Sequence, residues 1–402
     1  MNMKFKLLVF LGSLALLMNP ANAEVQINGF ASIVMGVDLE GQDDGNIPRE
    51  GYGDRTVDNL QESRVALQWS ADLGEGLRFV GQTMARGDSN DGFVLGYDWA
   101  YFDLNVGDSG KLKFGRVRIP FYKYSDYLDV GYAYHWVTPP PAMYNLSFSN
   151  VDGIGYQQNF SNGSLEHSLN MVFGRYQGSL NIGGVPNPGN LENFLAVNWS
   201  AAIGDHEFYA AYAQADVYIT SDLLWNDVNE DGAIAADGTE GVASSALALS
   251  LDSNDVLING DLGSFVGVGY KGTFGDLSLF AEWSEVVVED SILGDSSIGY
   301  YLGAAYNMGD LTYHITYEAQ ENDGSTFNGT GLEAVEDGVI TEGEASSIII
   351  GLRKDIGMSS AMKVELTSFT EDDKEIPSAS NPTGAAVERD ALILKVAIET
   401  MF

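Results

Sequence analysis

The stretch "DVNEDGAIAADG" carries side chains whose spacing could bind a metal ion. Asp227, Asn229 and Asp231 supply oxygen atoms at positions one, three and five, and a glycine follows at position six. This order is typical of the first half of a calcium-binding loop. Position twelve is Gly238 instead of a bidentate Glu, so a neighbouring acidic residue would have to replace it. We expect calcium at Asp227, Asn229 and Asp231, with a solvated acidic loop as the alternative.

A second acidic stretch, "EAVEDGVITEGE", has the complementary fault. Gly338 and Glu344 fit a calcium loop, whereas Val335 offers no side-chain oxygen at position three.

Enzymatic chemistry is not indicated by the sequence. The four histidines are scattered, and neither a nucleophile elbow nor a paired-histidine metal motif is present. Basic stripes that would suit nucleic acid are also absent. We therefore expect a protein that is not an enzyme, has no cofactor apart from possible calcium and binds no nucleic acid.

Charge is strongly segregated along the chain. The formal net charge is −37, and the 46 residues from Val217 to Leu262 contain nine acidic residues and no Lys or Arg. The few cations lie mostly in or beside segments that alternate between apolar and polar residues. Six of them are candidate functional side chains: Arg64, Arg78, Lys113, Arg116, Arg118 and Lys363.

Those cations lie in or beside segments of about ten residues whose alternating pattern predicts β-strands. The alternation predicts strands at 24–38, 61–71, 77–86, 94–105, 111–117, 152–160, 165–175, 191–201, 206–217, 263–272, 277–287, 297–307, 311–320, 344–354, 361–370 and 389–402. Short turns rich in Gly, Asp, Asn and Ser, such as "GDSG" and "SNGS", alternate with longer connections. An even number of strands with short turns at one end and long loops at the other is typical of an outer-membrane barrel.

The two faces of the strands support a membrane barrel. Leu311, Tyr313 and Ile315 share one face, while His314 and Glu318 share the other. A lipid-facing Lys or Arg at the bilayer midplane would cost about 2–4 kcal/mol, so mid-strand cations should point into the lumen. A large soluble β-protein, whose strands would alternate likewise, is the alternative fold.

The N-terminus reads as a secretory signal peptide. Two lysines precede the apolar run "LLVFLGSLALLM", which is followed by "ANA", a small-residue cleavage site. The run has 12 residues, fewer than the roughly 20 that a spanning helix needs. We expect residues 1–23 to be removed and residues 24–402 to form one transmembrane barrel domain. The chain has no cysteine, which excludes a disulfide framework.

One long segment, "GRVRIPFYKYSDYLDVGYAYHWVTPPP" (Gly115 to Pro141), has neither helical nor strand periodicity. Its three final prolines exclude a helix or a central strand. A sixteen-stranded barrel has a lumen too wide for its own side chains to fill, so a segment could lie inside it. The tyrosines and Trp136 could then bury their ring faces while their polar ends reach wall groups or water. An exposed loop whose aromatics join an interface girdle is the alternative.

The chain resembles the general porins of Gram-negative outer membranes over its whole length after residue 23. The resemblance rests on "EVQINGFASIVMGVD" as a first strand, on sixteen strands with long loops, on "KLKFGRVRIPFY" leading into the third long loop, and on "LILKVAIETMF" ending in Phe402. The acidic PEF-type motif of the family's third loop is missing. The resemblance implies an all-β, 16-stranded antiparallel transmembrane β-barrel with short periplasmic turns, long external loops and an inward-folded third loop.

The resemblance also implies a function and a set of roles. It implies a homotrimeric passive channel for small hydrophilic solutes and ions, embedded in outer-membrane lipid and lipopolysaccharide and inserted by the barrel-assembly machinery through Phe402. A basic wall would face an acidic loop across the constriction, where Tyr122, Tyr124, Asp126 and Asp129 would lie. Cations that only pair with carboxylates of the lumen are the alternative. The excess of acidic residues favours cations. A sugar-specific channel with a tyrosine stacking track, or an adhesin with a closed pore, are the alternative functions.

Overall fold

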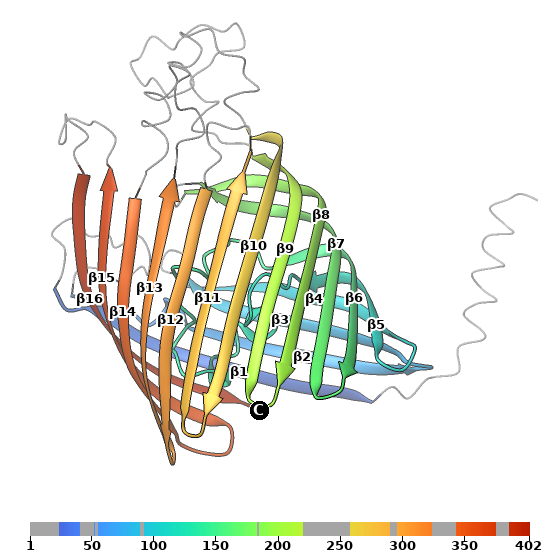
Figure 1. Cartoon of the computed structure of the whole chain (residues 1–402), viewed down its shortest axis with the longest axis horizontal. Helices are drawn as coiled ribbons and strands as arrows, with labels where there is room; N and C mark the ends of the chain where they lie inside the picture. Colours follow the sequence, from blue (N-terminus) through green and yellow to red (C-terminus); the bar gives the residue numbers. More distant parts are fainter. Residues whose placement is uncertain are drawn as a thin grey trace, which may run out of the picture.

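The computed structural model describes residues 24–40, 52, 55–88, 92–182, 185–219, 258–289, 296–323, 343–374 and 386–402. Most of them lie in sixteen antiparallel strands that form one closed sheet (Figure 1). The strands are β1 Val25–Asp38, β2 Arg64–Gly74, β3 Leu77–Asp88, β4 Gly92–Val106, β5 Gly110–Arg118, β6 Asn150–Asn162, β7 Leu165–Ile182, β8 Val185–Ile203, β9 His206–Ile219, β10 Asn259–Phe274, β11 Leu277–Val288, β12 Ser296–Met308, β13 Leu311–Asp323, β14 Gly343–Asp355, β15 Ser360–Lys374 and β16 Ala386–Met401.

The barrel closes where its last strand meets its first. Phe30 of β1 pairs with Met401 of β16, and the register continues to Asp38 and Ile393. Beyond the strand, Gly29 and Phe402 exchange backbone hydrogen bonds of 2.7 and 2.9 Å. Closure matters because a sheet edge left open would expose unpaired backbone groups to lipid. Among the described residues, no helix has the length and apolar character needed to cross a bilayer.

The predicted alternation of the strands is confirmed. On β13, Tyr313 and Ile315 are exposed on the outer face, whereas His314, Thr316 and Glu318 are buried on the inner face. The sixteen predicted strands all form, and most differ from the prediction only by a few residues at their ends. The pattern was readable because each strand separates lipid from the lumen, and the two sides demand opposite side chains.

One long connection was predicted wrongly. Residues 176–190 were expected to form a long loop, but residues 176–182 and 185–190 extend β7 and β8 as a hairpin in which Ile182 pairs with Val185. Local register shifts next to Arg175 and Asn193 break the strict alternation within this hairpin, which explains why it was not recognised as strand.

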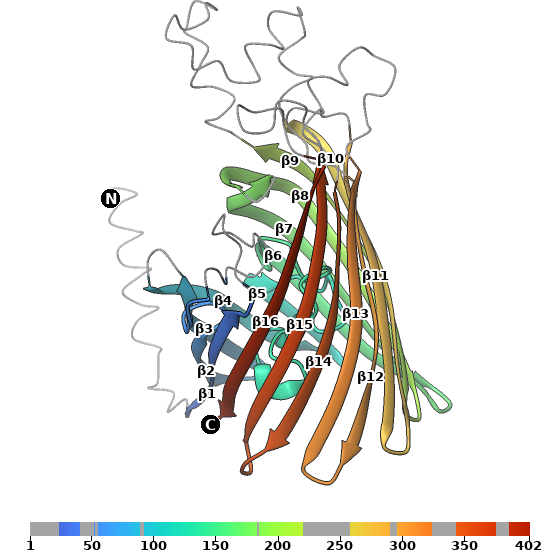
Figure 2. The same ribbon diagram turned by 90° about the vertical axis from the view of Figure 1, so that its left-hand side faces the viewer.

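The strands are very unequal in length. β5 has nine residues, whereas β8 on the far side of β6 and β7 has nineteen. The chain therefore leaves the sheet early at Arg118 and re-enters it at Asn150. Figure 2 shows the segment between them inside the barrel, level with the middle of the neighbouring strands.

Candidate pore constriction

Residues 119–149, here called loop 3, cross the lumen of the barrel. They contain two single-turn 3-10 helices, η1 Ser125–Tyr127 and η2 Gly131–Ala133. Two glycines allow the loop to approach the wall closely. A Cβ on Gly131 would lie 2.2 Å from Glu399 Oε1 on β16, and a Cβ on Gly299 of β12 would lie 2.5 Å from the Ala142 carbonyl oxygen. The predicted inward fold of this segment is confirmed, and its position as an exposed loop is excluded.

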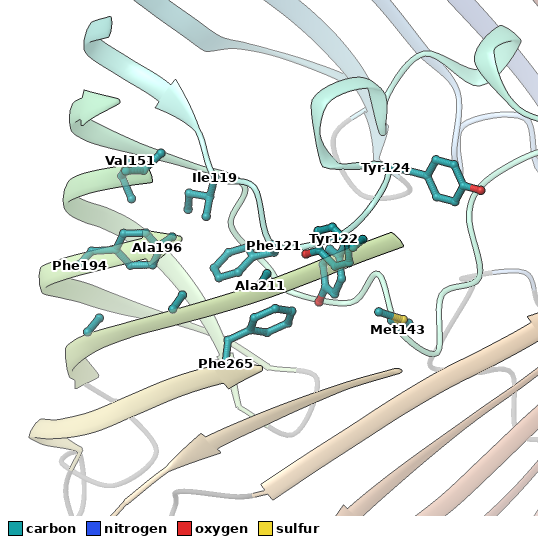
Figure 3. Packing of buried hydrophobic residues seen from close by; sticks show 14 of the residues in the cluster. Ile119, Phe121, Tyr122, Tyr124, Met143, Val151, Phe194, Ala196, Ala211 and Phe265 are labelled. Carbon is teal, nitrogen blue, oxygen red and sulfur yellow. The ribbon is translucent and has the colours of Figure 1, made fainter. Parts of the chain in front are cut away.

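Aromatic packing holds loop 3 against the inner faces of β7 to β12. Phe121 lies between Phe194 of β8 and Phe265 of β10, with ring centroids 5.9 and 4.9 Å away (Figure 3). Further along the loop, Trp136 meets Phe280 of β11 edge-on at 4.9 Å. We call this side of the lumen the apolar wall; its buried members include Val172, Leu180, Leu191, Phe194, Ala196, Ala211, Ala213, Ala215, Val217, Phe265 and Phe280.

Charged groups hold the same loop against β13 to β16, which we call the charged wall. Lys363 of β15 is fully buried and donates hydrogen bonds to the carbonyl oxygens of Gly131 and Trp136. It also forms an ion pair of 2.5 Å with Glu399. Arg353 of β14 donates to the carbonyl oxygens of Tyr132 and Tyr134 at 2.7 and 2.8 Å.

Carboxylates of the barrel wall accept hydrogen bonds from backbone N–H groups of loop 3. Val137 N–H donates to Glu365 at 2.7 Å, and Ala142 N–H donates to Glu318 at 2.8 Å. Glu282 accepts the hydroxyl of Tyr144 at 2.6 Å. An irregular segment cannot pair its backbone within a sheet, and buried backbone groups need partners. These wall side chains supply the partners that a neighbouring strand would otherwise give.

Asp129 anchors the start of loop 3 to the strands from which it departs. Its carboxylate accepts hydrogen bonds from Arg64 at 3.1 Å and Arg118 at 2.9 Å, and Arg86 lies at 3.3 Å. Burial raises the pKa of Asp129, but Arg118, Arg86 and Arg64 outweigh burial and hold that pKa well below its usual range. Asp129 is therefore ionised at neutral pH.

The predicted pore residues separate into two groups. Arg64, Arg118, Asp129, Tyr122, Tyr124 and Lys363 are all in contact with loop 3 or belong to it, and the tyrosines lie in its buried core. Arg64 and Asp129 were expected on opposite sides of the constriction, but they are in direct contact. Arg64 and Asp129 therefore form an ion pair and do not create an electric field across a water-filled constriction.

The remaining predicted residues do not join the Asp129 cluster. Arg78 donates to Ser70 Oγ at 2.6 Å, and the Lys113 ammonium lies 5.5 Å from the centre of the Tyr101 ring. Arg116 forms a two-pronged pair with Asp152, with distances of 2.8 and 2.9 Å. Asp126 is exposed and lines a space on the other side of loop 3.

The calcium candidates Asp227, Asn229 and Asp231 lie outside the described residues, as does most of the second acidic stretch. The part of the chain that the structure describes contains no group of three or more His, Asp or Glu side chains placed to hold a metal ion. Calcium binding by the first stretch stays a prediction. Phe402 has its backbone paired with Gly29, and its exposed ring packs over that glycine on the outer surface.

Several residues that fix loop 3 were not singled out from the sequence. Arg86 lies on the same face of β3 as Arg78, so the alternation that placed Arg78 in the lumen also applies to it. Glu282, Glu318 and Glu365 occupy inward positions of strands in which apolar and polar side chains alternate, and they could have been found in the same way. No local signal, however, pairs a given carboxylate with a given backbone N–H of a distant loop.

Loop 3 separates open spaces at its two faces. Toward the short turns lies a space of about 640 Å³, bordered by Lys123, Asp126, Glu207 and the inner faces of β6 to β9. Toward the long loops lie spaces of about 450 and 160 Å³. Both of the latter border residues 146–148 of the loop.

Comparison with models of protein families identifies a family for this chain. The sequence model described as Gram-negative porin matches residues 12–335. Comparison with curated protein sequences finds no relative. Among solved structures, the chain is similar in fold to the outer membrane channel DcaP of Acinetobacter baumannii, at 13% identity, 96% and 99% coverage of the two chains and a TM-score of 0.58. It is also similar to the trimer form of OmpT of Vibrio cholerae (12%, 94% and 99%, 0.54) and to an anion-selective porin from Comamonas acidovorans (13%, 95% and 100%, 0.55).

At these identities the solved structures establish the fold, while the family match covers most of the chain. A closed sixteen-stranded barrel with a lipid-facing exterior and a loop across its lumen agrees with that match. The resemblance read from the sequence is confirmed: the chain belongs to the Gram-negative porins and is an outer-membrane channel for the diffusion of small solutes.

Proposed function

We propose that loop 3 acts as a rigid constriction that sets which small hydrophilic solutes pass through the barrel. The observation that carries this proposal is that both sides of the lumen hold the loop. Lys363 and Arg353 bind its carbonyl oxygens on one side, and Phe194 and Phe265 pack against it on the other. A constriction fixed on two sides keeps a constant shape, so selection by size and charge needs no energy input.

Purified protein in planar lipid bilayers tests this function directly. We expect stepwise single-channel conductance in potassium chloride that scales with salt concentration, and a reversal potential in a salt gradient that favours cations, because the chain carries a net charge of −37. The absence of any conductance would contradict the channel function and favour an adhesin with a closed pore. An anion-selective reversal potential would contradict only the cation preference.

A sugar-specific track of stacked tyrosines is a weaker candidate. Tyr122, Tyr124 and Tyr134 are each no more than 5% exposed, because their rings pack on neighbouring aromatic rings. A sugar stacks on an open ring face, and these faces are already covered.

We further propose that the channel is a homotrimer, because the similar OmpT of Vibrio cholerae has a trimer form. The exposed apolar side chains of β4, among them Leu95 and Tyr97, offer a surface for a second copy on the short-strand side of the barrel. Chemical crosslinking of the protein in detergent would then give a three-chain species that separates on heating. A single-chain species at all temperatures would contradict the trimer.

Export and assembly complete the proposal. Removal of residues 1–23 would give a protein whose N-terminal sequencing begins at Glu24. Phe402 would act as the signal for the barrel-assembly machinery, so that deleting it lowers the amount of folded barrel in outer membranes without changing the conductance of the molecules that insert. Contact of the acidic loops with lipopolysaccharide through divalent ions is part of the same proposal.

A further inference from the structure

An apolar pocket lies inside the lumen, on the long-loop side of loop 3. Its volume is about 160 Å³, and apolar side chains make up most of its lining. Phe121 and Phe148 of loop 3 border it on one side, and Phe194, Val217 and Phe265 border it from the barrel wall. An apolar cavity of about 150 Å³ is large enough to hold benzene. The pocket therefore has the size of a single aromatic ring.

An apolar pocket is unexpected at this place, because the interior of a water-filled barrel is normally polar. Here the inward positions of successive strands carry Leu180, Ala215, Val217 and Val286. Loop 3 does not cover all of this apolar wall surface. The part of the surface nearest the long loops lies beyond Phe121 and Phe148. Apolar surface in contact with water is unfavourable, and a concave patch of it is a typical site for an apolar ligand group.

A polar space of about 450 Å³ adjoins the apolar pocket. The two share Leu146, Ser147 and Phe148 of loop 3, and the Phe148 ring lies 5.1 Å from Tyr176 on the polar side. The charged groups at the border of this space are Arg86, Arg116, Arg118, Asp98 and Asp129. Arg116 is neutralised by Asp152, whereas Arg64, Arg86 and Arg118 share the two carboxylates of Asp98 and Asp129. Around Asp98 and Asp129 the charge is therefore net positive, which suits a ligand with one negative charge.

We propose that these two spaces together form a binding site for a small aromatic monocarboxylate. The ring occupies the apolar pocket that Phe121, Phe194 and Phe265 border, and the carboxylate passes Phe148 and faces the arginines of the polar space. This inference names a class of solute for the channel. Passage of that solute rests on the proposed channel function, whereas its binding does not, because binding needs no conductance. The formal net charge of −37 does not exclude such a ligand, since the field of exposed charges is screened beyond about 8 Å at physiological salt.

The test is calorimetric binding of three matched probes to the protein in lipid nanodiscs at physiological salt. 3-Phenylpropionate carries both the ring and the charge, propionate only the charge and 3-phenylpropan-1-ol only the ring. We expect saturable binding of 3-phenylpropionate and, for each of the other two probes, affinity weaker by about tenfold or more, because each loses one of the two interactions. Equal affinity for 3-phenylpropionate and propionate would overturn the ring site.

Three variants locate the site. Ala215→Phe fills the apolar pocket and should weaken binding of 3-phenylpropionate by about tenfold or more. Arg116→Gln removes one guanidinium from the polar space and should weaken it by about threefold to tenfold, while binding of the alcohol stays unchanged. Ala210→Phe is the matched control, because Ala210 lies on the same strand but shares the outer face with Phe208 and Tyr212. Unchanged binding in Ala215→Phe would overturn the proposal.

Two further measurements cover folding and competing occupants. Toluene should compete with 3-phenylpropionate for the unaltered protein, which tests the ring pocket without any substitution. Binding that appears only after lipid is stripped would show that the pocket holds an acyl chain, and would overturn the proposal. Conductance in potassium chloride is recorded in parallel: a conducting channel without ring-dependent binding refutes only this site, whereas binding without conductance refutes only the channel function.

Discussion

The two sides of the lumen hold the same loop by different chemistry. On the charged wall, Lys363, Arg353 and Glu365 bind individual carbonyl and N–H groups at hydrogen-bond distance. On the apolar wall, Phe194 and Phe265 hold Phe121 by packing without a directional bond. Hydrogen bonds between this wall and the loop involve Glu282 and Asn198. A buried charged group is costly when one of its hydrogen-bonding partners is missing. Apolar packing depends instead on the side-chain volume that fills the space, and it tolerates changes of side-chain shape.

This difference assigns separate tasks to the two walls. The charged wall fixes the register of loop 3, because each contact specifies one backbone atom. The apolar wall fixes how closely the loop approaches the strands and leaves surface free beside it, where the proposed ring site lies. The substitutions below test that division, from the largest expected effect to the smallest.

Lys363→Met should have the largest effect. It leaves Glu399 buried without its cation and frees the carbonyl oxygens of Gly131 and Trp136. Breaking a buried ion pair by removing one partner costs about 3–5 kcal/mol. We expect a free energy of unfolding lower by this amount in guanidinium titrations in lipid vesicles, together with larger and noisier single-channel currents. The double variant Lys363→Met/Glu399→Leu should recover part of the stability; no recovery would contradict a specific pair.

Phe121→Ala should lower the free energy of unfolding by about 3 kcal/mol, the lower end for a buried Phe, because its ring already borders a pocket. Phe121→Leu, which keeps most of the volume, should cost less than about 1.5 kcal/mol. Both are measured in the same titrations. If Phe121→Leu were as damaging as Phe121→Ala, the apolar wall would be as specific as the charged wall, and the division of tasks would be wrong.

Acid should loosen the start of loop 3. The pKa of Asp129 is lower in the folded protein than in the unfolded chain, so its stabilisation is complete above the unfolded value of about 3.9 and is lost as pH falls below it. We expect a loss of up to roughly 2 kcal/mol, read as a falling thermal midpoint between neutral pH and strong acid. Asp129→Asn should be less stable at neutral pH and should lose part of this acid dependence. Asp126→Asn is the control, because Asp126 is exposed and lies away from the three arginines; an equal loss there would refute the assignment.

Thr316→Val should have the smallest effect. It removes the hydroxyl oxygen that accepts the Trp136 Nε1–H at 2.9 Å, and it keeps the shape of the side chain. A buried donor left without an acceptor costs about 1–3 kcal/mol, and we expect about 1 kcal/mol because only one neutral bond is lost. Thr316→Ser keeps the hydroxyl and should be near the unaltered protein in thermal midpoint. A larger loss in Thr316→Ser than in Thr316→Val would mean that the methyl group, and not the hydrogen bond, matters.

The sequence by itself determined most of each strand, the closure and the family, but not the extension of β7 and β8. Alternation along each strand is imposed locally, because every second residue of a membrane strand meets lipid. The aromatic, proline-terminated segment after β5 could be assigned to the lumen for a related reason: no regular element could contain it, and a barrel of sixteen strands leaves space inside.

Only the tertiary structure decided which groups meet across the lumen. Asp129 was expected to face Arg64 across open water, but the two form an ion pair. Arg86, which was not predicted from the sequence, also contacts Asp129. Lys363 and Trp136 are 227 residues apart in the chain, yet the Lys363 ammonium binds the Trp136 carbonyl. Such contacts depend on where a loop without periodicity lies in three dimensions. That position results from many weak interactions acting together, and no short stretch of sequence encodes it.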